Sequence, residues 1–191
     1  MEWNWVEFLA VIFGVIPIYL NAREIVWGWP TSIVGAVLLG FIAYQAQLYA
    51  SVGLNGVYII LGFYGWYEWI YGGDNQSRLT ISVTAFPTLL TLLIAGMIGT
   101  IGIGYFFRQN TDADLPYWDA FGTAFSLVGT YMLARKKLEN WVLWIVVDAV
   151  FVGIYVVKEL YLLALLYFLY LGLAAYGYRN WQRSLKVDVS G

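Results

Sequence analysis

One face of the segment 140–157 carries the residues best suited to bind a charged ligand. Trp141, Trp144 and Asp148 follow one another at i, i+3 and i+7, which places them on one side of a helix. A carboxylate at the centre of a membrane span costs about 2.5–3.5 kcal/mol on insertion scales, so it usually faces a cavity or a partner group. An organic cation would neutralise Asp148, and each tryptophan face would add about 0.5–2 kcal/mol of cation–π attraction. The pattern predicts a site for an organic cation.

Two further segments present aromatic and amide side chains at helical spacing. The first carries Asn55, Tyr58, Gly62, Trp66 and Trp69; the second carries Tyr167, Tyr170, Ala174, Tyr178 and Trp181. The small residues at their centres leave room for a cavity lined by rings and hydrogen-bonding groups. The predicted substrate-binding residues are Trp141, Trp144, Asp148, Gln45, Asn55, Tyr58 and Tyr170. We predict no catalytic, cofactor-binding or metal-binding residue.

The same residues also allow structural interpretations. Asp148 could be hydrogen-bonded between helices, with Trp141 as an interfacial anchor. Trp66, Trp69 and Trp181 lie near the expected cytoplasmic ends of their segments, where aromatic residues usually form a belt at the interface.

Charged and polar residues gather at those same ends. Asn21 and Glu24 indicate helix capping or a gate, and Glu68 is expected to snorkel or to pair with a basic loop residue. The run 135–137, Arg-Lys-Lys, is most simply a topology signal.

The composition predicts an all-α membrane protein. The 191 residues are 61% hydrophobic and 12% charged, about half the charged fraction of a soluble domain. Apolar runs near the length of a membrane-spanning helix recur along the chain and predict seven spans. They cover residues 5–25, 29–49, 53–71, 81–107, 115–134, 140–157 and 161–178. The absence of cysteine excludes disulfides, and without histidine a zinc site or histidine acid–base chemistry is nearly excluded.

The basic residues predict the orientation. With seven spans, eight of the ten lysines and arginines fall on one face, and only Arg108 and Lys158 fall on the other. The richer face should be cytoplasmic. We therefore expect a multi-pass protein of the bacterial inner membrane, with the N-terminus outside, the C-terminus inside and the first helix retained, since no signal-peptide pattern precedes it.

The sequence repeats without gaps at an interval of 112 residues. Matches include Tyr19, Ala22, Arg23, Trp29, Tyr58, Tyr64, Gly65 and Trp69 with Tyr131, Ala134, Arg135, Trp141, Tyr170, Tyr176, Gly177 and Trp181. Two copies of three helices, separated by one helix, would be parallel in a 3+1+3 arrangement like that of SWEET transporters. The predicted parts are a first repeat (1–71), a linker with the fourth helix (72–114), a second repeat (115–181) and a basic tail (182–191). In the linker helix, Gly96, Thr100 and Gly104 suit close helix packing.

Three stretches carry a resemblance to a known family. The residues 47–50 (Gln-Leu-Tyr-Ala), 64–69 (Tyr-Gly-Trp-Tyr-Glu-Trp) and 139–148, with its two tryptophans and Asp148, resemble the PnuC family of bacterial vitamin transporters. The resemblance implies facilitated diffusion of a B vitamin, which an intracellular kinase or pyrophosphokinase then traps without necessary contact. It supports Trp141, Trp144 and Asp148 as binding positions, helped by Gln45 and polar groups of the third helix. The expected partners are the vitamin and the lipid bilayer, with no cofactor and no nucleic acid, and a homo-oligomer is left open.

The residue at position 148 bears on the choice of vitamin. Family members that transport nicotinamide riboside tend to carry asparagine where this chain has Asp148, and they are usually longer. Thiamine carries a permanent thiazolium charge and an aminopyrimidine that a carboxylate can pair with. Thiamine is therefore the first expectation and nicotinamide riboside, also a cation, the alternative.

Two other functional classes deserve comparison. A retinal-type sensor with seven helices needs a Schiff-base lysine in its last helix, and the segment 161–178 contains none. A membrane enzyme needs an acid and a base, and the spans offer only one clear buried carboxylate. We therefore expect a transporter and not an enzyme.

Overall fold

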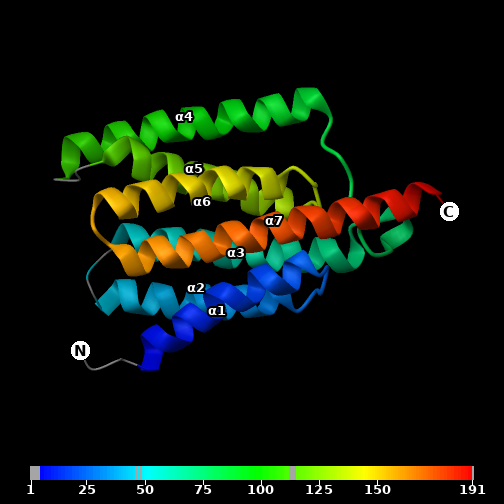
Figure 1. The fold of residues 1–191 in the computed structure, drawn as a ribbon, viewed down its shortest axis with the longest axis horizontal. Helices are drawn as coiled ribbons and strands as arrows, with labels where there is room; N and C mark the ends of the chain where they lie inside the picture. The colour runs from blue at the N-terminus through cyan, green and yellow to red at the C-terminus, as the bar shows by residue number, and fades with distance from the viewer. Residues whose placement is uncertain (1–4, 46, 48, 112–114, 191) are drawn as a thin grey trace. The chain divides into compact units, whose positions relative to one another are not determined.

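The chain forms seven α-helices and one short 3-10 turn within residues 5–45, 47, 49–111 and 115–190, which are those that the computed structural model describes (Figure 1). The helices are α1 (Trp5–Ala22), α2 (Gly28–Gln45), α3 (Tyr49–Tyr71), α4 (Phe86–Asn110), α5 (Pro116–Ala134), α6 (Asn140–Val157) and α7 (Tyr161–Ser190), and the turn η1 covers Asp74–Gln76. The predicted all-helical fold and the predicted number of helices are confirmed.

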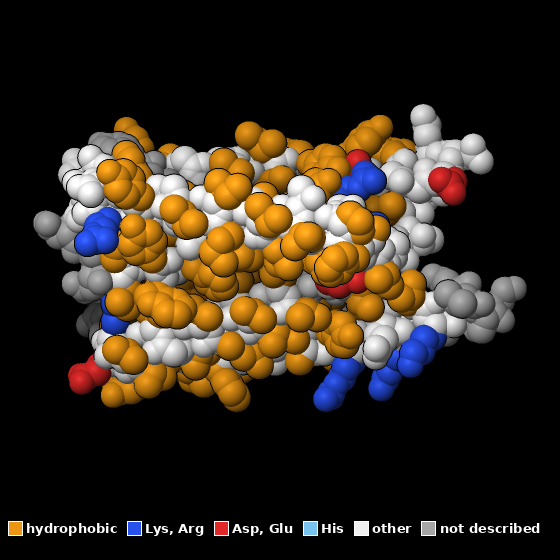
Figure 2. All heavy atoms as spheres, turned by 90° about the horizontal axis from the view of Figure 1, so that it is seen from above, with side chains coloured by type: hydrophobic (Ala, Val, Ile, Leu, Met, Phe, Trp, Pro, Cys, Tyr) orange, Lys and Arg blue, Asp and Glu red, His pale blue; other side chains and the backbone are white. Residues whose placement is uncertain are grey.

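Three of these helices are long and apolar enough, by length and composition, to cross a membrane. They comprise Phe86–Asn110, Asn140–Val157 and Tyr161–Lys186, and a shorter apolar stretch covers Ile12–Ala22. The exposed surface of α4 is largely apolar, since it buries only Gly96, Thr100 and Gly104. Figure 2 shows hydrophobic side chains spread along the visible face and charged ones near the helix ends. Such a surface suits contact with lipid.

Several helix ends differ from the predicted ranges, and the start of α4 and the end of α7 differ most. The fourth helix begins at Phe86 instead of Ile81, and Pro87 lies in its first turn, where a backbone N–H would have no partner within the helix. The stretch before this helix is held in place: the Leu138 amide donates to the Ser82 carbonyl at 3.0 Å, and the Thr84 hydroxyl donates to Glu139 Oε2 at 2.6 Å. The seventh helix continues past residue 178 to Ser190, and this extension contains Arg179, Gln182, Arg183 and Lys186, which favour helix formation.

The chain divides into two compact units. The first contains α1, α2, α3, residues 134–136 and the part of α7 from Arg179; the second contains α4, α5, α6 and α7 up to Tyr178. In the second unit, the predicted packing surface of α4 is confirmed, because Gly96 and Gly104 lie against the rings of Phe125 and Tyr117 in α5. The division into two three-helix repeats and a linker remains a prediction.

Local structure recurs at the same interval of 112 residues as the sequence. The bounds of α2 and α6 coincide at this interval, and Glu24 and Gln47, like their equivalents Lys136 and Glu159, have positive φ. These residues follow the C-terminal ends of helices, where left-handed backbone closes the last turn. The sequence repeat is therefore also a repeat of helix and turn.

The packing of glycine against tryptophan recurs as well. A Cβ atom at Gly65 would overlap the ring of Trp29, and a Cβ atom at Gly177 would overlap the ring of Trp141. Each contact lies between the second and third helices of its copy, so both tryptophans need a neighbour without a side chain.

We predict that Gly177→Ala lowers the stability of the protein in detergent by about 1–3 kcal/mol, because the added methyl group overpacks the Trp141 ring. Thermal unfolding of the purified variant measures the loss. Gly172→Ala is the matched control, since no atom lies within 4 Å of its added Cβ in the same helix. Equal melting temperatures for the two variants would contradict the packing argument.

Candidate binding site

Asp148 lies near the middle of α6 and is buried in the second unit. Its exposure is 4%, that of Trp141 is 2%, and Trp144 is half-buried. The three share the helix face that the sequence predicted. Among the residues that the structure describes, no lysine or arginine forms an ion pair with Asp148. A buried carboxylate without a counter-charge is costly, so this position favours a ligand that brings a positive charge.

A cluster of aromatic rings, which we call the α6–α7 ring cluster, continues from Asp148. It consists of Phe151, Tyr155, Tyr167 and Tyr170. The ring centroid of Tyr167 lies 4.9 Å from that of Phe151, 5.2 Å from that of Tyr155 and 5.4 Å from that of Tyr170. Phe151 and Tyr155 follow Asp148 by three and seven residues, so they lie on the same face of α6 as the carboxylate. The unit therefore combines a carboxylate with polarisable ring faces.

Small residues of α5 make room for the rings of α6. A Cβ atom at Gly129 would lie 3.2 Å from the Trp144 ring, and one at Gly122 would overlap Phe151. These two glycines are seven residues apart, which puts them on one side of α5 two turns apart. The sequence analysis did not single out Gly122, Gly129 or Phe151. The seven-residue spacing of the two glycines was the signal in the sequence that could have indicated this packing face.

Four of the seven predicted binding residues belong to the second unit: Trp141, Trp144, Asp148 and Tyr170. Gln45, Asn55 and Tyr58 belong to the first unit, and their part in the same site stays a prediction. Gln45 is exposed at the end of α2. Asn55 is half-buried and donates from Nδ2 to the Ser51 carbonyl at 2.9 Å.

Trp69 in α3 and Trp181 in α7 have different surroundings from those expected. Trp69 and Trp181 are 3% and 0% exposed, so the interpretation as interfacial belt residues is wrong for both. They are buried because their rings contact each other, with centroids 5.9 Å apart, and Trp69 also meets Trp29 edge-on at 5.7 Å. The prediction that Glu68 pairs with a basic loop residue is confirmed by its 2.8 Å contact with Arg135.

Comparison with known proteins identifies the family. The family model described as "Nicotinamide mononucleotide transporter" matches residues 4–183. The chain belongs to this family. One relative of the chain is the nicotinamide riboside transporter PnuC of Escherichia coli (strain K12), 26% identical over 96% of this chain and 87% of the relative. The riboflavin/roseoflavin transporter RibM of Streptomyces davaonensis is 27% identical over 93% of this chain and 84% of the relative.

A solved structure has the same fold. The crystal structure of the vitamin B3 transporter PnuC superposes with a TM-score of 0.74, at 22% identity, over 95% of this chain and 82% of the other. The resemblance to the PnuC family is thus confirmed, and the chain is an integral membrane transporter. Its relatives are transporters, so the prediction that it is not an enzyme is confirmed by them.

We predict that Trp144→Ala weakens the binding of a cationic vitamin by about tenfold, because a ring face available for cation–π contact is removed together with its apolar area. Calorimetric titration of the purified protein with thiamine and with nicotinamide riboside measures the change. Trp118→Ala is the control, since Trp118 lies in the same unit with 52% exposure. Similar losses in both variants would exclude a specific contact with Trp144.

Proposed function

We propose that the protein is a facilitative transporter for a cationic aromatic B vitamin and that Asp148 is the counter-charge of this substrate. One observation carries the proposal: Asp148 is buried at 4% exposure beside the α6–α7 ring cluster, and no basic side chain among the described residues pairs with it. An aromatic cation would satisfy the carboxylate and the ring faces together.

The charge requirement distinguishes the vitamins that relatives transport by name. Nicotinamide riboside carries a pyridinium charge, whereas riboflavin is uncharged at neutral pH. A neutral flavin would leave the Asp148 carboxylate without a partner in a desolvated site, which is unfavourable. This supports a cationic substrate over riboflavin.

Thiamine is our first candidate among the cations. Its thiazolium ring supplies a permanent charge and an aromatic face, and its aminopyrimidine can donate a hydrogen bond to a carboxylate. The presence of a carboxylate at position 148, which can pair with both groups, supports thiamine. Nicotinamide riboside is the second candidate, because the relative from Escherichia coli is a nicotinamide riboside transporter by name.

The proposed cycle needs no energy source of its own. One buried carboxylate that pairs with the substrate leaves no evident group to carry a coupled ion, so we infer uniport driven by the vitamin gradient. Modification by a kinase or pyrophosphokinase inside the cell would keep that gradient inward. The 3+1+3 repeat arrangement and the inner-membrane location with a cytoplasmic C-terminus belong to this proposal. A seven-helix sensor is the alternative from another class; the lack of lysine in residues 161–178 disfavours a retinal-type version.

Counterflow in proteoliposomes tests the proposal. Vesicles loaded with unlabelled thiamine should accumulate radiolabelled thiamine without an ion gradient, and nicotinamide riboside should compete better than riboflavin. We predict that Asp148→Asn lowers uptake of the cation at least about tenfold, since a charge-assisted contact is replaced by a neutral one.

Asp74→Asn is the matched control, because Asp74 is exposed in η1, outside the site. Counterflow of riboflavin alone, unchanged by Asp148→Asn, would contradict the proposal. Counterflow of nicotinamide riboside but not of thiamine would support the cation site and make nicotinamide riboside the first candidate substrate.

A further inference from the structure

Two pairs of repeat-equivalent residues contact each other in the first unit. Glu24 and Lys136 are 112 residues apart, and Glu24 Oε2 lies 3.0 Å from Lys136 Nζ. Trp69 and Trp181 are also 112 residues apart, with ring centroids at 5.9 Å. Equivalent positions touch only where two copies meet face to face, as in an isologous interface. The ends of α1, α3, α5 and α7 near these residues therefore hold a junction between the two copies.

The ion pair joins two residues whose backbone is left-handed. Glu24 and Lys136 have φ of 56° and 46°, in the left-handed region just past the ends of α1 and α5. Glycine or asparagine is the usual residue at such a position, because a Cβ atom is strained there. Gln47 and Glu159 have the same left-handed backbone, so it is the ion pair, and not the turn, that distinguishes Glu24 and Lys136.

A second ion pair and two hydrogen bonds cross the same junction. Arg135 Nη1 lies 2.8 Å from Glu68 Oε2, whose side chain is 12% exposed. Trp181 Nε1 donates to the Asn21 carbonyl at 3.1 Å, and Asn180 Nδ2 donates to the Ala22 carbonyl at 2.9 Å. Glu68 and Asn180 are themselves repeat equivalents. Both positions take part in the junction, but only Glu68 carries a charge.

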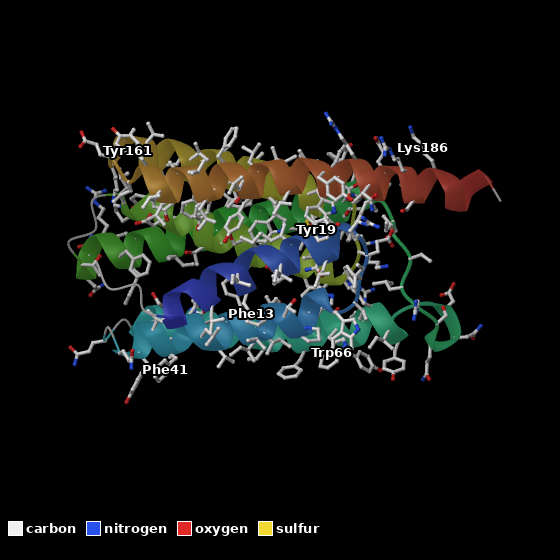
Figure 3. The ribbon with its side chains drawn as sticks, turned by 60° about the horizontal axis from the view of Figure 1, so that its bottom comes forward. Phe13, Tyr19, Phe41, Trp66, Tyr161 and Lys186 are labelled. Atoms are coloured by element: carbon white, nitrogen blue, oxygen red, sulfur yellow. The ribbon has the colours of Figure 1, made fainter. Side chains whose placement is uncertain are left out.

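The junction is partly buried, and its lysine contacts an aromatic ring as well as Glu24. Lys136 is 7% exposed, and its Nζ lies 4.7 Å from the centroid of the Trp69 ring. Tyr19 in α1 and Trp66 in α3, neighbours of this junction along their helices, lie toward the same end of the first unit as Lys186 and away from Phe41 (Figure 3). By the distribution of basic residues, this is the end expected to face the cytoplasm.

We propose that this junction is a latch that must open for the substrate to leave toward the cytoplasm; the role in substrate release rests on the proposed transport function. We call it the basic-end latch and define it as Glu24, Lys136, Glu68, Arg135, Trp69 and Trp181. Ion pairs suit this task because the desolvation of the charges offsets much of their attraction, so the closed state is specific without being irreversible. Apolar side chains at the same positions would hold the copies together without such a balance.

The experiment uses the absence of cysteine from the natural chain. Asn21→Cys introduces one thiol at a position that is 4% exposed and whose carbonyl is covered by Trp181. Its side-chain oxygen has no hydrogen-bond partner among the described residues, so the replacement should be tolerated. The rate of labelling by a membrane-impermeant maleimide, added from the C-terminal side of full-length protein in vesicles, reports opening of the latch.

We expect Glu24→Gln and Lys136→Gln, each in the Asn21→Cys background, to raise the labelling rate by about tenfold, because each leaves a partly buried charge unpaired. The charge exchange Glu24→Lys with Lys136→Glu should return the rate toward that of the parent. Glu159→Gln is the matched control: Glu159 has the same left-handed backbone at the end of α6 and is exposed.

Unchanged labelling in both single variants would overturn the latch, and so would an increase that the charge exchange fails to reverse. Labelling of each single variant is measured at the same number of degrees below its own melting temperature. Recovery of the labelling rate in the charge-exchanged variant shows that the faster labelling of the single variants does not come from misfolding. Labelling requires no substrate. A failure of vitamin counterflow with the expected labelling pattern would therefore refute the proposed function and leave the junction as a mobile ionic contact.

Discussion

The burial of the Asp148 carboxylate is the constraint on which the rest of the account depends. At 4% exposure it has lost most of its hydration, and no lysine or arginine among the described residues replaces that hydration. A protein that served only its own stability would place a neutral or apolar side chain there. A bound cation would offset the free-energy cost of burying this carboxylate during part of the transport cycle.

The neighbouring packing follows from the same constraint. Gly129 and Gly122 of α5 keep the backbone close to α6 and leave space for Trp144 and Phe151. Tyr167 of α7 contacts three other rings of the cluster, which limits its rotation and fixes the ring faces near the carboxylate. Rigid aromatic side chains lose little entropy when a ligand binds, so such a cluster is well suited to a flat cationic ring.

Much of this organisation could be predicted from periodicity, and the remainder depended on tertiary contacts. The face of Trp141, Trp144 and Asp148 follows from helical spacing alone, and the interval of 112 residues anticipated the matching turns at Glu24 and Lys136. The burial of Trp69 and Trp181 could not be read from one helix, because each ring is covered by residues far away in the sequence. The start of α4 depended on the hydrogen bonds of Ser82 and Thr84, which no local pattern reports.

The central claim is that the site recognises positive charge and not only a flat ring. The most direct measurement compares nicotinamide riboside with its reduced dihydropyridine form, which keeps nearly the same shape and is uncharged, by calorimetry on the purified protein. We predict that the cation binds at least about tenfold more tightly than the neutral form. Equal affinities, or tighter binding of the neutral form, would contradict it.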